Sequence, residues 1–323
     1  MPTGKSAAKM LQWMGNPARF ADFYNGNVFG GSKVIHPEEL VPAKGEIHKI
    51  EKDKDKSQKE IHRYRDIIMY WKKYGINLAI LAIENQKNVH LAMPVRNMMY
   101  DSIAYQEQID FHWNLLSQEE KNKCSKKEYL SHYLIGEKLN PIITLVFYYG
   151  DDEWLENTEL YNMLEMEELE KMHPEVKQYI QNYKLNLIDM MHMKDINVFH
   201  SDLQYVFGML KYKGNKELLS SYVNENPEYF NYIDKETALV IGELLDSEDI
   251  LKTADEIREG KRMSMCKALE DLYNEGRLEG RLDALTVQIR KKLAKGKSIA
   301  EIADALEETT EAIESIIKKQ GLL

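Results

Sequence analysis

The chain has 323 residues, of which 43% are hydrophobic and 30% charged, an ordinary balance for a globular protein with one large domain or two smaller ones. Its formal net charge of −10 argues against a nonspecific nucleic-acid coat. No segment approaches the ~18 consecutive apolar residues that a membrane span requires.

Two further features concern the compartment. The cysteines, Cys124 and Cys266, are far apart in the sequence, which suits free thiols in a reducing compartment. Residues 1–15 contain lysines but no continuous apolar core, so they do not have the pattern of a secretion signal. We therefore expect a cytoplasmic protein without a membrane partner.

The first elements form an α/β pattern. Asn16 followed by Pro17 predicts the start of a helix over 18–29, and Gly30-Gly31 predicts its end. His36 begins a short element. A polar loop over 44–58 then leads into strands over 61–70 and 78–86.

The pattern continues with a helix that Pro94 opens and that runs to about Asn114. The polar stretch 115–133 is an insertion, and the β-branched and aromatic run 140–150 predicts another buried strand. Helix, strands, helix and strand together define an α/β unit over about 16–150.

From Glu159 onward no strand signal is convincing, and helical periodicity dominates. Residues 255–293 are typical of one long charged helix containing the repeat Glu-Gly-Arg-Leu-Glu-Gly-Arg. A helical pair follows, over 298–306 and 310–319. We predict three parts: an α/β domain at 1–155, a helical domain at 156–254, and an oligomerisation segment at 255–323.

The final pair has the length of a helix-turn-helix, so DNA reading has to be considered. Its second helix begins Thr310-Glu311-Ala312 and lacks Arg, Asn or Gln near its start to reach base edges. The sequence therefore favours self-association over base reading for this pair.

The strand over 78–86 ends in the polar residues Glu84, Asn85 and Gln86. Residues two apart on a strand point the same way, so Glu84 and Gln86 project together. Burying a carboxylate is costly unless something pairs with it, and a divalent metal is one such partner. The alternative is an ordinary strand that ends in surface polar residues.

A second acid, Asp66, precedes another apolar segment. Arg63 and Arg65 stand just before it, in a stretch (41–75) where ten Lys or Arg face six Asp or Glu. A basic strip beside two acids suits the approach of a phosphate, although alternating charges are also typical of a solvated loop.

The sequence resembles the Rpn family of recombination-promoting nucleases and transposase-like proteins, a branch of the PD-(D/E)XK nucleases. The resemblance covers most of the chain. It rests on residues 19–22, 65–67, 83–86, 92–96, 100–101, Tyr105, Gln108, the strand from Pro141 to Gly150, and the Glu-Gly-Arg repeats with the final helical pair.

The resemblance implies a PD-(D/E)XK-like core of helix, mixed sheet, helix and strand, followed by an all-helical region. It implies Mg²⁺-dependent hydrolysis of DNA phosphodiester bonds, with low sequence specificity and a connection to recombination or mobile elements. Asp66 and Glu84 would hold Mg²⁺, and the backbone carbonyl of Asn85 would be a third oxygen ligand. No covalent enzyme intermediate is implied.

The same resemblance suggests further residues. Gln86 stands where the wider superfamily has Lys; it can orient a water but cannot act as a base. Arg96 is a candidate source of positive charge. Asp22 is a possible additional acid, and Tyr105 and Gln108 fall on one helical face that could touch the DNA backbone, although Tyr105 also suits the core.

Two other interpretations compete with the nuclease. The chain could be a non-catalytic nucleic-acid-binding or regulatory protein on a nuclease scaffold, as Gln86 and the acidic net charge suggest. It could also be a helical oligomer scaffold, with the α/β domain as a passenger.

Overall fold

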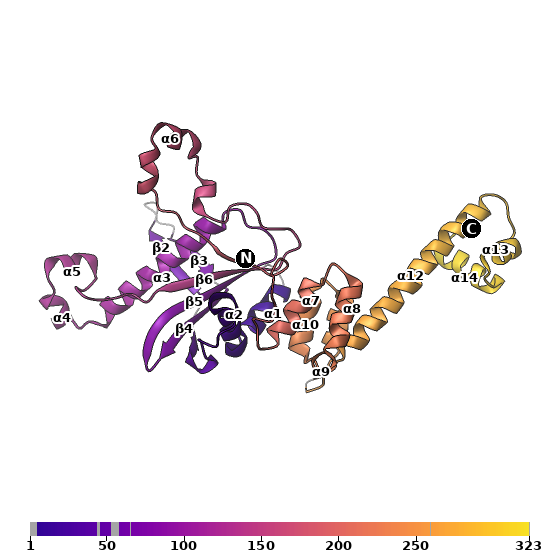
Figure 1. Cartoon of the computed structure of the whole chain (residues 1–323), viewed down its shortest axis with the longest axis horizontal. Coiled ribbons are helices and arrows are strands. Elements are labelled where there is room, and N and C mark those ends of the chain that lie inside the picture. Colours follow the sequence, from indigo (N-terminus) through magenta and orange to yellow (C-terminus); the bar gives the residue numbers. More distant parts are fainter. Residues whose placement is uncertain (1–4, 44–45, 53–57, 65, 259, 323) are drawn as a thin grey trace. The chain divides into compact units, whose positions relative to one another are not determined.

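The computed structural model describes residues 5–43, 46–52, 58–64, 66–258 and 260–322 (Figure 1). The chain forms two compact units, of which the first is Met1–Tyr222 with Leu239–Ser247. The second is Val223–Ala238 with Glu248–Leu323. The three-part division expected from the sequence stays a prediction.

A five-stranded mixed sheet is the centre of the first unit, with strand order β1-β4-β5-β6-β7. The contacts β1–β4 and β4–β5 are antiparallel, whereas β5–β6 and β6–β7 are parallel. β2 and β3 form a separate antiparallel pair. The strands are β1 (Leu40–Pro42), β2 (Glu46–Lys52), β3 (Gln58–Tyr64), β4 (Ile67–Lys73), β5 (Ile76–Gln86), β6 (Ile142–Tyr148) and β7 (Asn186–Asp189). The predicted α/β class with a mixed sheet is confirmed.

Helices make up most of the rest of the described chain. In order they are α1 (Lys5–Met14), α2 (Pro17–Phe29), η1 (Pro37–Glu39), α3 (Met93–Leu115), α4 (Gln118–Lys123), α5 (Lys126–Ser131), η2 (Leu160–Met163), α6 (Glu167–Met172), η3 (Pro174–Tyr179), α7 (Leu203–Lys211), α8 (Lys216–Glu225), α9 (Pro227–Phe230), α10 (Lys235–Leu244), α11 (Glu248–Asp255), α12 (Met265–Leu293), α13 (Ile299–Leu306) and α14 (Thr310–Gln320).

The ends of α2 follow the sequence signals. The Asn16 side chain accepts a hydrogen bond from Ala18 N, and Pro17 is the first helical residue. Gly30 ends the helix with φ 59°, a left-handed conformation that glycine adopts without steric cost. The sequence prediction for this helix is confirmed.

One face of the sheet packs against α2 and α7. The Phe147 ring of β6 lies 5.3 Å from the ring of Phe23 and 5.2 Å from that of Phe207, measured between centroids. All three rings are fully buried. An aromatic cluster therefore joins α2, β6 and α7, and it fixes α2 over the sheet.

The opposite face of β6 carries the alternate residues and meets α3. Val146 and Tyr148 pack with Met93 and Trp154 in one buried cluster. Thr144 Oγ1 also donates to Asp101 Oδ1 of α3 at 2.9 Å. The two-residue period of β6 thus places α3 on the sheet face opposite α2 and α7.

Three sequence predictions are wrong in part. The stretch 44–58, expected to be loop, contains β2 and the start of β3. The region after Glu159 contains the strand β7, which is only four residues long and lies parallel to β6. The long helix expected over 255–293 begins at Met265, because a bridge between Ile233 and Met263 precedes it.

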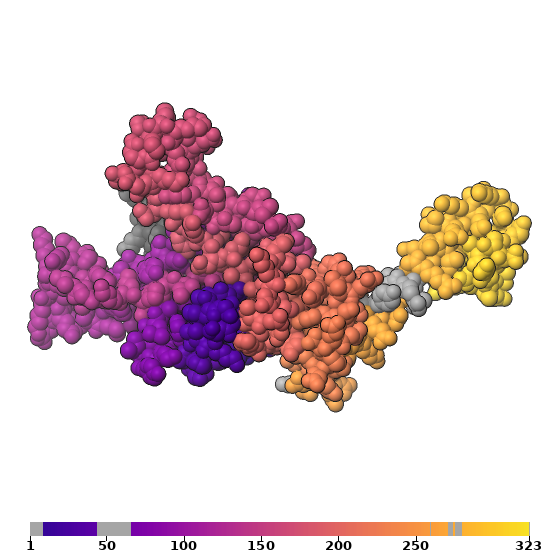
Figure 2. Space-filling view, viewed as in Figure 1, coloured from indigo at the N-terminus to yellow at the C-terminus, as the bar shows by residue number. Residues whose placement is uncertain are grey.

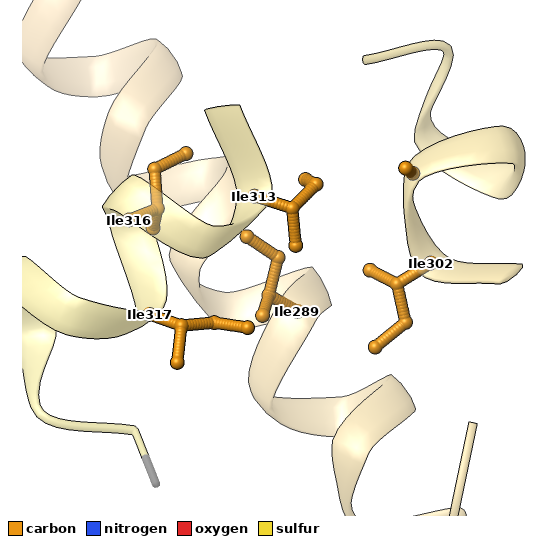
Figure 3. Packing of buried hydrophobic residues seen from close by; sticks show 6 residues of the cluster. Ile289, Ile302, Ile313, Ile316 and Ile317 are labelled. Atoms are coloured by element: carbon orange, nitrogen blue, oxygen red, sulfur yellow. The ribbon is translucent and has the colours of Figure 1, made fainter. Parts of the chain in front are cut away.

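In the second unit, the last three helices share a hydrophobic core. Ile289 of α12 is fully buried beside Ile302 of α13 and Ile313 of α14 (Figure 3). Figure 2 shows α13 and α14 as a compact yellow body. The helical pair predicted from the sequence is confirmed, whereas oligomerisation through it stays a prediction.

Candidate active site

The two acids singled out in the sequence come from neighbouring strands. Ile67 of β4 pairs with Ile83 of β5, so Asp66 precedes β4 across from Glu84. Asp66 Oδ2 accepts a hydrogen bond from the backbone N–H of Asn85 at 2.7 Å. This bond ties the Asp66 carboxylate to the residue that follows Glu84.

Glu84 is fully buried, and its charge is paired from α3. Arg96, in the first turn of that helix, places Nη2 3.2 Å from Glu84 Oε2. Arg96 Nε also donates to the Tyr100 hydroxyl at 3.2 Å. The guanidinium is 17% exposed and points into the acid pair.

The electrostatics agree with this arrangement. Burial raises the pKa of Asp66 above its usual range, against the opposing effects of the Asn85 hydrogen bond and the Arg96 charge. Burial alone would lower the pKa of Arg96, but Glu84, Tyr100 and Asp66 together raise it. The charge of one guanidinium thus acts on both acids.

The acid pair supplies oxygen donors, the kind of ligand that the implied Mg²⁺ requires. Among the described residues, no group of three or more His, Cys, Asp or Glu side chains could hold a metal ion. The predicted set of Asp66, Glu84 and the Asn85 carbonyl has two carboxylates and one neutral oxygen. Such a set fits Mg²⁺, because this ion keeps several waters and needs only one or two carboxylates. Burial raises the pKa of Asp66, so a bound cation would favour its charged form.

Gln86 ends β5 and is partly exposed. By strand alternation it belongs to the same face as Glu84, whereas Asn85 belongs to the other face. The Gln86 backbone carbonyl accepts from Tyr149 N at 3.1 Å, which extends the contact of β5 with β6 beyond Tyr148. Its amide is therefore placed at the rim, at the end of the strand that carries Glu84.

Sequence reasoning did not single out His90, Asn97 or the side chain of Asn85. Asn97 Oδ1, His90 Nδ1 and the Asn85 side-chain amide are buried without a hydrogen-bond partner in the described part of the chain. Burial, followed by the charge of Arg96, lowers the pKa of His90. The sequence feature that could have pointed to His90 is its position between β5 and α3, six residues before Arg96.

A second group that the sequence did not reveal lies at the carboxyl ends of β5 and β6. Lys87 pairs with Asp246, which also accepts from Lys213 Nζ at 2.6 Å. Lys213 in turn pairs with Asp151 at 2.9 Å. Burial, followed by the charges of Asp66, Glu243 and Asp246, raises the pKa of the neighbouring Tyr149 to about 12.

The predicted DNA contacts on α3 take other roles. The Tyr105 hydroxyl accepts from Ile142 N at 3.2 Å. The buried Gln108 side chain accepts from Asn140 N at 2.8 Å and donates to Asn140 O at 3.2 Å. Both residues fasten α3 to the start of β6, and their contact with DNA stays a prediction.

The three arginines predicted to bind DNA lie in different places. Arg96 forms an ion pair with Glu84, and its contact with DNA stays a prediction. Arg65 lies outside the described residues. Arg63 lies in β3, of which only the backbone is described.

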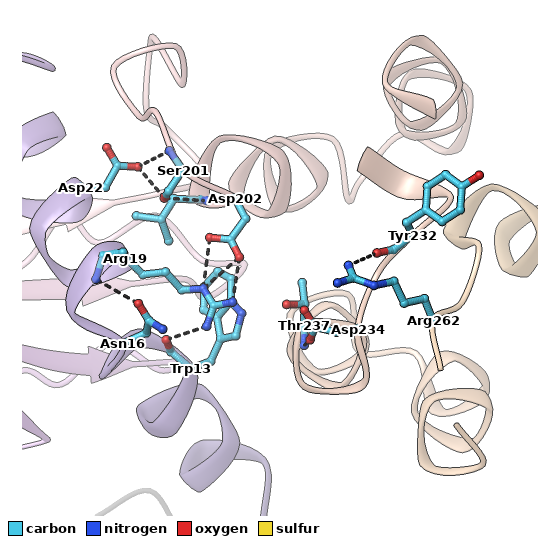
Figure 4. Close-up of polar contacts among 12 residues, drawn as sticks. Trp13, Asn16, Arg19, Asp22, Ser201, Asp202, Tyr232, Asp234, Thr237 and Arg262 are labelled. Carbon is cyan, nitrogen blue, oxygen red and sulfur yellow. Dashed lines mark hydrogen bonds and ion pairs between the residues drawn. The ribbon is translucent and has the colours of Figure 1, made fainter. Parts of the chain in front are cut away.

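Asp22 anchors a distant loop. Its carboxylate accepts from His200 N at 2.9 and 3.0 Å, from Ser201 N at 2.8 Å and from Ser201 Oγ at 2.6 Å. One turn earlier, Arg19 forms an ion pair with Asp202 at 2.8 Å (Figure 4). These bonds engage both oxygens of Asp22 and tie α2 to this loop, and the role of Asp22 as an additional acid of the site stays a prediction.

The fold and the acid pair define a class: an α/β protein with a mixed sheet, compatible with a nuclease-like core that is followed by helices. Residues 125–239 match a family model described as Putative transposase, YhgA-like. The resemblance to that family inferred from the sequence is confirmed over this stretch, which contains β6, β7 and α7 but not Asp66 or Glu84. No curated protein and no solved structure matches the chain. Among the helices described, none has the length and apolarity to cross a membrane.

Proposed function

We propose that the first unit is a Mg²⁺-dependent DNA endonuclease that hydrolyses phosphodiester bonds with low sequence specificity. The observation that carries this proposal is the juxtaposition of Asp66 and Glu84 from adjacent strands, with the Arg96 guanidinium between α3 and the sheet. The match to a transposase family supports a role connected with mobile elements or recombination.

Asp66, Glu84 and the Asn85 carbonyl would hold the ion. When bound, Mg²⁺ lowers the pKa of a coordinated water and offsets the charge that grows on the phosphate in the transition state. Gln86, at the rim, orients a water through its amide oxygen but accepts no proton at neutral pH. Arg96 balances part of the acid pair and keeps the Glu84 carboxylate fixed.

The proposal of low specificity rests on α14 and α3, the two described helices considered for contact with DNA. The first turn of α14 carries Glu311 and no Arg, Asn or Gln, so the helical pair has no side chains there to read base edges. On α3, Tyr105 and Gln108 are occupied by contacts with the chain itself.

Nicking of supercoiled plasmid tests the proposal in Mg²⁺, in Mn²⁺ and in EDTA. Asp66→Asn keeps a hydrogen-bond acceptor for Asn85 N, and Glu84→Gln keeps the side-chain volume; each is expected to abolish metal-dependent nicking. The matched control is Glu119→Gln, because Glu119 is an exposed acid of α4 that pairs only with Lys123 among the contacts observed for it. Asp66→Asn protein that nicks as fast as wild type would overturn the assignment of the site.

A second function is a non-catalytic nucleic-acid-binding or regulatory protein on a nuclease scaffold. The specific observation in its favour is the ion pair of Glu84 with Arg96, in a site where Gln86 supplies no charge. This candidate predicts DNA binding without any metal-dependent strand breakage. Nicking that requires both Mg²⁺ and Glu84 would exclude it.

A further inference from the structure

The end of α12 and the turn after it carry a dense positive charge. Five basic residues fall within eight positions, and no Asp or Glu occurs from 284 to 300. We call this segment the basic turn; it consists of Arg290, Lys291, Lys292, Lys295 and Lys297. A positive segment of this density stands out in a chain whose net charge is −10.

The basic turn is open to solvent. Four of its five side chains are exposed, and Lys292 is half-buried. No ion pair within the described part of the chain involves any of them. Glu301, the next acid along the chain, accepts from Ser298 N at 2.8 Å and from Ser298 Oγ at 2.7 Å in the capping box of α13. The positive charge therefore remains available to an anionic partner.

The backbone of the basic turn is ordered by its own hydrogen bonds. Gly296 N donates to Leu293 O at 2.8 Å, and Lys297 N donates to Lys292 O at 3.2 Å. Gly296 has φ 75°, the left-handed conformation that closes a helix C-terminus. The lysines on either side of Gly296 are thus displayed on a preformed turn, which reduces the entropy lost on binding.

Compensation of the helix dipole accounts for only part of the charge. Basic residues in the last turn of a helix are stabilised by its partial negative charge, which suits Arg290, Lys291 and Lys292. That effect falls off within the last turn. Lys295 and Lys297 follow the helix end, so the dipole does not account for them.

A membrane surface is a poorer partner than a polyanion in water. The isoleucines of this three-helix core are directed inward (Figure 3). In the described stretch 281–322, Val287 is the one large apolar side chain that is clearly exposed. Membrane-surface helices combine basic residues with an exposed apolar face, which this segment does not present.

We propose that the basic turn binds the phosphate backbone of DNA without reading its sequence. The choice of DNA as the polyanion rests on the proposed nuclease function. The contact lies in the second unit, on residues distinct from the acid pair, and would hold substrate near the chain while the first unit acts on it. Each contact between a basic side chain and a phosphate releases counterions from the duplex, so the binding depends on salt concentration.

Fluorescence anisotropy with a short fluorescein-labelled duplex in EDTA tests the contact without cleavage. The full-length chain is compared with Lys295→Gln/Lys297→Gln and with Arg290→Gln/Lys291→Gln, over a range of salt concentrations. Removing two phosphate contacts is expected to reduce the slope of log affinity against log salt by about 2, and to weaken binding about tenfold or more near 0.1 M salt.

The matched control is Lys126→Gln/Lys127→Gln, which removes the same charge from two exposed lysines of α5. An equal loss of affinity in this control, or an unchanged salt slope in both basic-turn variants, would overturn the proposal. Binding to vesicles of phosphatidylcholine and phosphatidylserine that exceeds binding to DNA would assign the surface to membranes and also overturn it.

The two proposals can fail separately. A chain that binds duplex DNA through the basic turn, but nicks no plasmid in Mg²⁺, would refute the endonuclease and leave the basic turn as a DNA contact. If the chain nicks plasmid, but both basic-turn variants bind DNA as tightly as wild type, the basic turn is refuted as a DNA contact and the endonuclease stands.

Discussion

Replacing Arg96 with Met tests the electrostatic arrangement of the acid pair directly. The substitution keeps a long apolar stem but removes the guanidinium, whose Nη2 lies 3.2 Å from Oε2 of the fully buried Glu84. Removing one partner of a buried ion pair leaves an uncompensated charge and costs about 3–5 kcal/mol. The side chain of Arg96 is 17% exposed, so solvent screens this pair little.

For a domain of about 150–250 residues, that loss corresponds to a fall of about 6–20 °C in the melting temperature of the first unit. Thermal unfolding followed by circular dichroism in EDTA measures it. The double variant Arg96→Met/Glu84→Gln removes both charges and is expected to recover part of the loss, because no unpaired charge remains.

Addition of Mg²⁺ extends the same experiment. A cation bound at the acid pair would replace part of the missing positive charge, so Mg²⁺ is expected to stabilise Arg96→Met more than wild type. An Arg96→Met protein as stable as wild type in EDTA would refute the reasoning, since Glu84 would then not depend on the guanidinium.

The remaining predictions concern parts of the chain away from Glu84. Asp22→Ala removes the acceptor for the backbone N–H groups of residues 200 and 201. Because these donors lose their partner, the free energy of unfolding measured in urea is expected to fall by about 2–4 kcal/mol. Asp22→Asn keeps an oxygen acceptor and should lower it less. The pKa of Glu128 is lowered to about 2 by the backbone N–H of Ile135, the Ser125 hydroxyl and the Ser125 N–H, so its NMR titration midpoint should lie near that value. Because the folded pKa lies below the unfolded one, the stability that Glu128 gives the α5 turn is present above pH 4.5 and is lost as the pH falls toward 2; a midpoint near 4.5 would show that the turn does not form. Ile289→Ala opens a cavity in the core of α12, α13 and α14 and is expected to cost about 2–5 kcal/mol, seen as faster amide exchange in α13 and α14 but not in β5.

The elements predicted best are those with strong local signals. The apolar run that becomes β5 is buried on both faces from Ala79 to Asn85, so its sequence shows no alternation and little ambiguity. Asn16, Pro17 and Gly30 mark the ends of α2 for reasons of backbone geometry alone. Such signals need no knowledge of the rest of the fold.

The elements that were missed depend on distant partners. β7 has only four residues and none of them is fully buried, so its strand conformation comes from pairing with β6 and not from its own pattern. β2 was likewise hidden in a polar, charged stretch, and the single strand expected over 61–70 is divided between the end of β3 and the start of β4. Pairing between strands is a tertiary property that a single window of sequence does not contain.

Some features of the candidate site could be predicted from the sequence and others could not. The adjacency of Asp66 and Glu84 could be predicted, because strand order and alternation determine where they lie. The direction of Arg96 could not, since a long flexible side chain in a helix can reach either DNA or a buried acid. Helical periodicity correctly grouped Tyr105 with Gln108, but their hydrogen bonds to Ile142 and Asn140 depend on how α3 docks on β6.

The return of residues 239–247 to the first unit constrains how the protein can be dissected. Asp246, in this returning segment, binds both Lys87 and Lys213. A fragment that stops at Tyr222 would remove Asp246 from Lys87, would leave Lys213 with Asp151 alone, and would delete nine residues that belong to the unit it was meant to isolate. Any truncation meant to separate the proposed catalysis from the proposed DNA contact should therefore cut after Ser247, where the first unit is complete in sequence.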